Sequence, residues 1–282
     1  MITLTSPQIT VSILDPGVDT ARLGSRYCTG GWIWQVNDAQ GRDLFSGPEY
    51  PKEPNTFDGQ GAPDMFFTPL GPDAPLGEEV GVIGVGRVRR TSPKEPFYVF
   101  DNREVIEFVQ WETEQGGDFV TMRTETAFKG WAYRLERAIR LKGSTIISRT
   151  AIESTGADTL PIRWFAHPFW PHTRDGVLSK FSVPVSMPEN PGYYVNEDGW
   201  VTRRPEHDWK QGWYQPLEVQ QGGFRLAVTQ KHPVCGEVRV ETNFFPDFLP
   251  IWANDRTYSF EPYYIRQLDS DEYTSWEIRY SF

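Results

Sequence analysis

The stretch YRLERAIRLKGSTIISRTAIES, residues 133–154, contains two alternating runs around a short turn. In the first run, 133–141, apolar residues alternate with charged ones, and Arg137 is the one charge on the apolar side. Alternation with a period of two is typical of a strand with one buried face and one wet face. The turn residues 142–144, Lys-Gly-Ser, separate the runs, so the stretch predicts an antiparallel hairpin.

The same pattern recurs along the chain. The segment WEIRYSF at 276–282 alternates aromatic or aliphatic residues with polar ones, and a Gln-Gly-Gly-Asp turn at 115–118 separates two more runs. No convincing helical period extends over about 10 residues. The long aromatic loops 48–75 and 184–216 are rich in proline and carry no linker composition. We therefore expect an all-β fold: a large antiparallel β-sandwich with few short helices, forming a single domain over 1–282.

Composition excludes several partners. The chain has a formal net charge of −10, and its basic runs are limited to 87–90 and 203–204, so no nucleic acid partner is expected. No apolar run of about 18 residues is present and the N-terminus does not resemble a secretion signal, so we expect no membrane association and a cytoplasmic protein. The two cysteines have no metal-binding spacing.

The segment RWFAHPFWPH, 163–172, is the first candidate for chemistry. His167 follows an alternating run and precedes prolines that stop ladder pairing, so we expect it at the end of a strand, and imidazole exchanges a proton near neutral pH. The alternative is a core histidine bonded to a backbone carbonyl, which the residues alone favour. His172 lies five residues later, a weak metal signal, and no metal site is expected.

Glu261 is the second candidate, because it lies between Phe260 and Pro262-Tyr263. Desolvation among aromatic residues raises the pKa of a carboxyl group, which suits a general acid or base. The alternative is a rim carboxylate paired with Arg266. A third segment, GVIGVGRVRR at 81–90, lacks the helix start of a nucleotide-binding loop, but its arginines are candidates for bonding sugar hydroxyls or a phosphate.

Four segments together resemble one family. They are RYCTGGWIWQVNDAQGRDLFS at 26–46, WFAHPFW at 164–170, FEP at 260–262 and LDSDEYTSWEIRYSF at 268–282. In this order they resemble the aldose 1-epimerase, or galactose mutarotase-like, superfamily, of which the chain looks like a divergent bacterial-type member. The resemblance covers most of the chain. It implies a β-supersandwich that binds a small-molecule sugar or sugar phosphate in an open cleft.

The resemblance also implies a reaction, the interconversion of α and β anomers by acid–base ring opening, with no cofactor. His167 matches the family's general acid, which acts on the ring oxygen, and Glu261 matches the base, which acts on the anomeric hydroxyl. Under this hypothesis both groups are accessible and face each other across a cleft one pyranose ring wide. Residues expected to bind the substrate are Arg87, Arg89, Trp164, Phe169, Trp170, His172 and Asp247.

The sequence departs from the family in two places. Val85 stands where the family has an earlier histidine, so Arg87 or Arg89 is expected to replace it, and Gln60 and Asp64 stand near the position of a sugar-holding arginine. These departures keep an alternative open, a non-catalytic carbohydrate-binding protein on the same fold. A polysaccharide lyase or a hydrolase accessory domain is a third hypothesis, which the chain length and the N-terminus disfavour.

Overall fold

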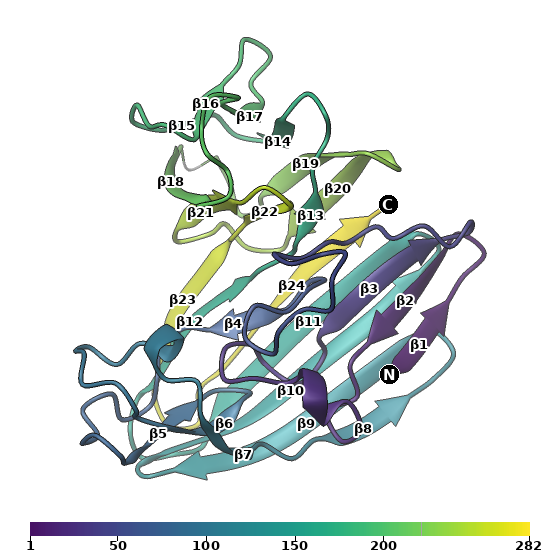
Figure 1. Ribbon diagram of the computed structural model, residues 1–282. Helices are drawn as coiled ribbons and strands as arrows, with labels where there is room; N and C mark the ends of the chain where they lie inside the picture. Colours follow the sequence, from purple (N-terminus) through teal and green to yellow (C-terminus); the bar gives the residue numbers. More distant parts are fainter. Residues whose placement is uncertain (221) are drawn as a thin grey trace.

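The computed structural model describes residues 1–220 and 222–282. Within these residues the chain forms 24 β-strands and two 3₁₀ helices, η1 (Thr20–Arg22) and η2 (Val99–Asp101). The strands make five sheets in which every pairing is antiparallel. The expected all-β sandwich with few short helices is therefore confirmed (Figure 1).

The largest sheet has ten strands, and the hairpin predicted at 133–154 supplies two adjacent interior strands of it. Tyr133 pairs with Ser154 and Lys142 with Thr145, so the turn falls where Lys-Gly-Ser predicts it. In order across the sheet the strands are β16 (Tyr193–Val195), β17 (Val201–Arg203), β14 (Val177–Phe181), β19 (Ala227–His232), β20 (Gly236–Thr242), β24 (Tyr273–Ser281), β11 (Thr145–Ser154), β10 (Trp131–Lys142), β9 (Phe119–Phe128) and β8 (Glu112–Gln115).

Four smaller sheets pack around it. Two of them are formed by strands from the N-terminal part of the chain. One consists of β1 (Ile2–Thr5), β2 (Ile9–Ile13) and β3 (Ile33–Asp38), and the other of β5 (Glu79–Val82), β6 (Gly86–Arg89) and β7 (Val105–Phe108). The other two carry the candidate site: β23 (Tyr263–Leu268), β12 (Leu160–Ala166) and β4 (Asp64–Phe66); and β13 (Trp170–Pro171), β22 (Thr257–Phe260), β21 (Leu249–Ala253), β18 (Trp213–Val219) and β15 (Val185–Ser186).

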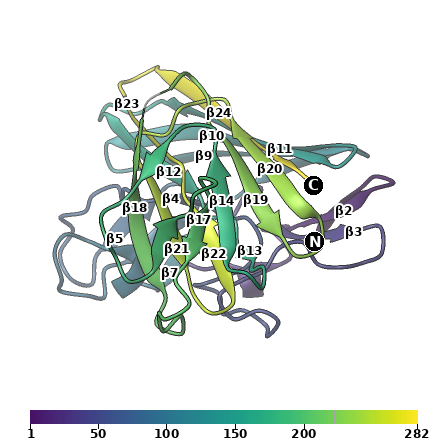
Figure 2. The same cartoon turned by 90° about the horizontal axis from the view of Figure 1, so that it is seen from above.

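Two antiparallel segments, residues 160–171 and 257–268, run side by side from the sheet of β12 into the sheet of β13. Phe165 of β12 pairs with Tyr263 of β23, and Trp170 of β13 pairs with Tyr258 of β22, so both pairs belong to one continuous antiparallel register. Pairing stops between them, because Pro168 and Pro262 have no N–H to donate. Figures 1 and 2 show β12 and β23 leading into the sheet of β13, β21 and β22.

The core contains one buried ion pair. Arg137 of β10 lies on the apolar side of its strand, as the alternation predicts, and its guanidinium contacts the carboxylate of Asp64 on β4. The same guanidinium donates to the hydroxyls of Thr150 and Ser148 on β11. The pair joins the large sheet to the sheet of β12, so Asp64 has a structural partner and does not reach the candidate site.

We expect Asp64→Ala to lower the free energy of unfolding by about 3–5 kcal/mol, because it leaves the Arg137 charge buried without a partner. The double variant Asp64→Ala/Arg137→Leu removes both charges and should recover most of that loss. Urea unfolding followed by tryptophan fluorescence measures both. A double variant as unstable as Asp64→Ala would contradict a charge-pair role.

Candidate active site

A cavity of about 580 Å³ opens where β12 and β23 leave their sheet. Its lining is mostly aromatic, with two arginines and two carboxylates. The lining residues are Arg26, Pro48, Asp58, Phe67, Tyr98, Phe100, Arg163, Phe165, His167, Phe169, Tyr214, Trp252, Glu261 and Tyr263.

The strand register brings the two candidate catalytic residues together. Continuing the pairing of Phe165 with Tyr263 by two residues places His167 opposite Glu261, inside the gap that the prolines leave. The Nε2 atom of His167 lies 3.4 Å from Oε1 of Glu261. Both backbones are fixed, since the His167 N–H donates to the Pro63 carbonyl and the Glu261 N–H donates to the Pro250 carbonyl.

The geometry differs from the expected cleft one ring wide with two accessible groups. The two side chains touch, and the exposed fractions of His167 and Glu261 are only 2% and 5%. They form a dyad on the wall of the cavity, so a sugar would approach both from the same side.

His167 also differs from the other three histidines. The Nε2 atoms of His172, His207 and His232 each bond a backbone carbonyl, which is the alternative that the sequence favoured for His167. The only polar side chain at Nε2 of His167 is Glu261, and its Nδ1 atom is buried without a hydrogen-bond partner among the described residues. The imidazole of His167 thus differs from the other three, because its Nε2 atom contacts a carboxylate.

Burial sets the protonation of the dyad. Desolvation raises the pKa of Glu261 to about 8, although the nearby Arg26 guanidinium opposes the rise. Desolvation lowers the pKa of His167 well below its ordinary value, and Arg26 lowers it further. Both shifts favour the uncharged forms. Burial therefore favours a carboxylic acid beside a neutral imidazole, a pair that holds one acidic proton.

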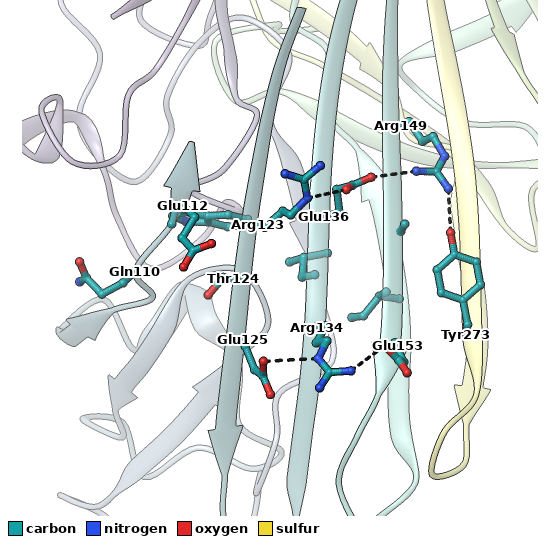
Figure 3. A pocket seen from close by; sticks show the side chains of 14 residues that line it. Gln110, Glu112, Arg123, Thr124, Glu125, Arg134, Glu136, Arg149, Glu153 and Tyr273 are labelled. Carbon is teal, nitrogen blue, oxygen red and sulfur yellow. Dashed lines mark hydrogen bonds and ion pairs between the residues drawn. The ribbon is translucent and has the colours of Figure 1, made fainter. Parts of the chain in front are cut away.

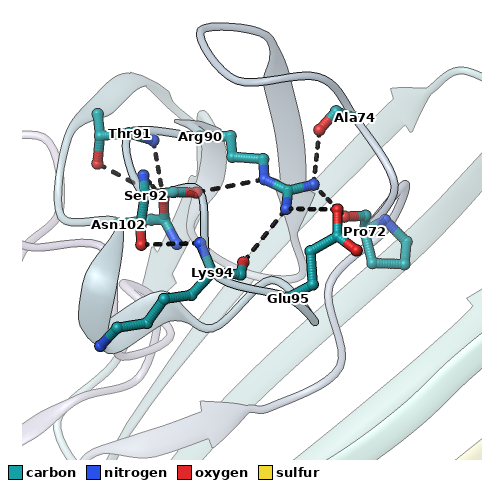
Figure 4. Close-up of polar contacts among 8 residues, drawn as sticks. All are labelled: Pro72, Ala74, Arg90, Thr91, Ser92, Lys94, Glu95 and Asn102. Atoms are coloured by element: carbon teal, nitrogen blue, oxygen red, sulfur yellow. Dashed lines mark hydrogen bonds and ion pairs between the residues drawn. The ribbon is translucent and has the colours of Figure 1, made fainter.

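A loop fixed by buried polar contacts brings Tyr98 and Phe100 to the cavity. Arg90 donates to the carbonyls of Ala74 at 2.8 Å and Lys94 at 3.2 Å (Figure 4). The Asn102 amide donates to the Tyr98 carbonyl at 2.8 Å. Within the basic run 87–90, Arg90 is therefore buried and holds this loop in place.

The other two arginines of that run do not reach the cavity. Arg87 pairs with Glu79 and Glu107, and Arg89 pairs with Glu104, all on the surface of the sheet of β5, β6 and β7. Because their charges are already satisfied by neighbouring strands, the expectation that they bind substrate does not fit the structure.

Of the expected aromatic residues, only Phe169 lines the cavity. Trp164 and Trp170 are buried in the main core, where Trp164 packs on Trp276 with ring centroids 5.1 Å apart. The alternation of β12 points Trp164 away from the side that carries Phe165 and His167, and Trp170 packs in the core from β13. Their expected role in sugar stacking is corrected to a role in the core.

Three further candidate residues also lie elsewhere. The ring of His172 stacks on Tyr258 and bonds the Asn254 carbonyl. Asp247 pairs with Arg266 at 3.0 Å, outside the cavity. Arg266 was the expected alternative partner of Glu261, but Asp247 holds it instead. Gln60 donates to the Trp34 carbonyl and is buried away from the site.

Sequence reasoning missed the cationic part of the site. Arg26 and Arg163 both line the cavity. Arg26 is the first residue of the segment 26–46, and Arg163 is the first residue of the segment 163–172 that contains His167. Each lies over aromatic rings, Arg26 at 4.4 Å from Phe100 and Arg163 at 4.6 Å from Phe67. The sequence signal for these residues is an arginine next to aromatic residues near a strand end. Many arginines with a purely structural role show the same pattern, so it does not identify a binding residue.

A larger hollow, of about 740 Å³, lies on the wet face of the large sheet (Figure 3). Its arginines already have carboxylate partners on neighbouring strands, which leaves little to recognise a ligand. The ion pairs form two ladders, Glu125–Arg134–Glu153 and Arg123–Glu136–Arg149, and Arg149 also bonds the Tyr273 hydroxyl. We therefore place the candidate site at the dyad.

Two other features bear on the class of site. No cluster of three or more potential ligands for a metal ion occurs among the described residues, and Cys28 and Cys235 are both free. Within those residues, no helix has the length and apolar character needed to cross a membrane.

Comparison with known proteins identifies the fold. No protein-family model matches the sequence, and no curated protein matches it. Among solved structures, a galactose mutarotase related enzyme from Lactobacillus acidophilus has a TM-score of 0.61 at 10% identity and covers 99% of this chain and 96% of its own. A galactose mutarotase-like protein from Lactobacillus casei has a TM-score of 0.57 at 12% identity, covering 100% of this chain and 99% of its own.

An aldose epimerase homologue from C. elegans has a TM-score of 0.54 at 10% identity and covers 99% of this chain and 97% of its own. The likeness to these structures extends over nearly the whole chain. This protein therefore has the galactose mutarotase-like β-sandwich fold, as the sequence resemblance implies.

The raised pKa of Glu261 predicts a cost in stability. In the unfolded chain this glutamate ionises near its ordinary pKa, whereas in the folded protein it stays protonated up to about pH 8. The free energy of unfolding therefore decreases as the pH rises from about 4.5 to about 8. Glu261→Gln removes that loss. Because each tenfold change in proton affinity is worth about 1.4 kcal/mol, we expect the variant to be more stable than wild type by a few kcal/mol at pH 8, and by much less at pH 4.5.

Chemical denaturation at both pH values measures this difference. Glu197→Gln, which makes the same substitution at an exposed glutamate outside the cavity, is the control. An equal effect of Glu261→Gln at both pH values would show that Glu261 is ionised in the folded protein.

Proposed function

We propose that this protein binds a sugar in the cavity and interconverts its α and β anomers, with His167 and Glu261 exchanging the protons. The observation that carries the proposal is the 3.4 Å contact between these two side chains on the wall of an aromatic pocket. The galactose mutarotase-like fold agrees with it, although a fold alone does not fix an activity.

The chemistry needs one acid and one base close together. The ring oxygen O5 and the anomeric hydroxyl O1 of an aldose are bonded to the same carbon, C1, so both fall within reach of two groups that touch each other. A separation of one ring width is not required. One donor and one acceptor at the correct positions supply what ring opening requires.

In the proposed step, the Glu261 carboxyl group donates its proton to O5 while Nε2 of His167 accepts the proton of O1. The C1–O5 bond breaks and C1 and O1 form a carbonyl group. After rotation about the C1–C2 bond, O5 attacks either face of C1. Its proton returns to Glu261, and His167 returns its proton to O1, so no net proton is gained or lost.

This assignment exchanges the two roles that the family resemblance implies. Burial favours the protonated carboxyl group and the neutral imidazole, which makes Glu261 the acid and His167 the base. The aromatic walls have a separate task. Tyr214 and Trp252 line the cavity beside the dyad, and their rings offer faces on which the C–H groups of a sugar can pack.

A second candidate, a carbohydrate-binding protein without catalysis, is favoured by one observation. The low exposure of both dyad residues restricts the approach of a substrate. Under this alternative the aromatic walls bind the sugar, and the dyad serves only to hold β12 and β23 together.

Magnetisation-exchange NMR on a panel of aldoses and aldose 6-phosphates separates the two. We expect wild type to accelerate anomer exchange and His167→Ala or Glu261→Gln to lose roughly 10²–10⁴-fold each. His172→Gln is the matched control and should keep the wild-type rate. Folded wild-type protein that binds sugars without accelerating exchange would favour the binding-protein alternative.

The pH dependence gives a further prediction. The dyad loses its acidic proton as the pH rises through about 8, so kcat/KM should fall above that pH. Because Arg26 lowers the pKa of Glu261, Arg26→Met should move this fall to higher pH. Exchange rates measured across the pH range test both statements, and a fall that moves to lower pH in the variant would contradict them.

A further inference from the structure

Arg163 of β12 is placed to reach the cavity from the same side as His167, which directly follows the last residue of that strand. The two residues are four positions apart in nearly extended chain, so their Cα atoms are separated by roughly 13 Å. The guanidinium lies 4.6 Å from the ring centre of Phe67 and 5.3 Å from that of Tyr263. Its position between two rings fixes its orientation before any ligand arrives.

The charge of Arg163 has no counter-ion in the part of the chain that the structure describes. No carboxylate there lies within ion-pair distance of it, and its buried Nε atom has no hydrogen-bond partner. By contrast, Arg26 pairs with Asp58 at 3.7 Å, and Arg266 pairs with Asp247. A partly buried guanidinium without a partner is costly unless it serves a ligand.

Three phenol groups line the same cavity as Arg163. Tyr98, Tyr214 and Tyr263 all line it, and none of their hydroxyls makes a hydrogen bond within the described residues. Burial raises the pKa of each phenol, with Glu261 adding to the rise and Arg163 opposing it. The phenols therefore keep their protons and offer three O–H donors near Arg163.

Among the charged groups of the cavity lining, Arg163 is the cation without a carboxylate partner in the described residues. The charge of Arg26 is balanced by Asp58, Glu261 is protonated, and Arg163 remains. An oxyanion is the ligand group that an arginine fork and hydroxyl donors bind together.

We propose that Arg163, with these phenol donors, binds an anionic substituent of the sugar, a phosphate or a carboxylate, on the part of the molecule away from C1. The inference rests on the proposed function, because it assumes that C1 lies at the dyad. It makes Arg163 a specificity-determining residue and an anionic sugar the preferred ligand class.

Equilibrium binding to three probes tests this inference. Glucose, glucose 6-phosphate and glucuronate share one ring and differ in the group at C6. By isothermal titration calorimetry we expect wild type to bind at least one anionic probe about tenfold or more tightly than glucose, with the preference weakening at high salt. Arg163→Met should abolish the preference and leave glucose affinity nearly unchanged.

Two variants control the experiment. Arg163→Lys keeps the charge without the planar fork and should retain part of the preference, which also covers the case in which Arg163→Met does not fold. Arg266→Met removes an arginine that lies over Tyr264 outside the cavity and should change nothing.

Each outcome bears on the inference. A preference for the phosphate alone, or for the carboxylate alone, supports it and identifies the anionic group. Equal affinity for all three probes, or a preference that survives in Arg163→Met, overturns it. Because binding is measured without turnover, a protein that binds anionic sugars but exchanges no anomers would contradict the proposed catalysis and leave this inference standing.

Discussion

The candidate site depends on one antiparallel register. The pairing of β12 with β23 continues in step into the pairing of β13 with β22, and two prolines interrupt the ladder between them. The interruption leaves room for side chains where backbone pairing would otherwise continue. His167 and Glu261 occupy opposite sides of that gap, so residues more than ninety positions apart in the sequence touch.

The fold holds buried ionisable groups in two different ways. Burial raises the pKa of Asp64 to about 6, but the Arg137 guanidinium in direct contact opposes the rise and also donates to two hydroxyls, so that pair is ionised at neutral pH. The dyad has no comparable set of donors, and desolvation drives both of its groups toward their neutral forms. A neutral pair that retains one acidic proton can transfer it to a substrate.

Much of the architecture could be predicted from the sequence, because alternation and turn residues are local signals. The hairpin at 133–154 and the inward position of Arg137 are examples. The site was harder, since residues 164–166 are all buried and alternation there does not distinguish the core face from the cavity face. Contact between His167 and Glu261, and the loop that brings Tyr98 to the cavity, depend on long-range pairing that no local pattern contains.

The proposed chemistry requires that the dyad at neutral pH consist of a neutral imidazole and a protonated carboxyl group. Nitrogen-15 NMR of histidine-labelled protein, with the His167 signals assigned from the His167→Ala variant, reports the charge of that ring directly. We expect one protonated and one bare nitrogen at pH 7, persisting well below the ordinary pKa of histidine. Two protonated nitrogens at pH 7 would show an imidazolium beside an ionised Glu261 and would contradict the neutral dyad.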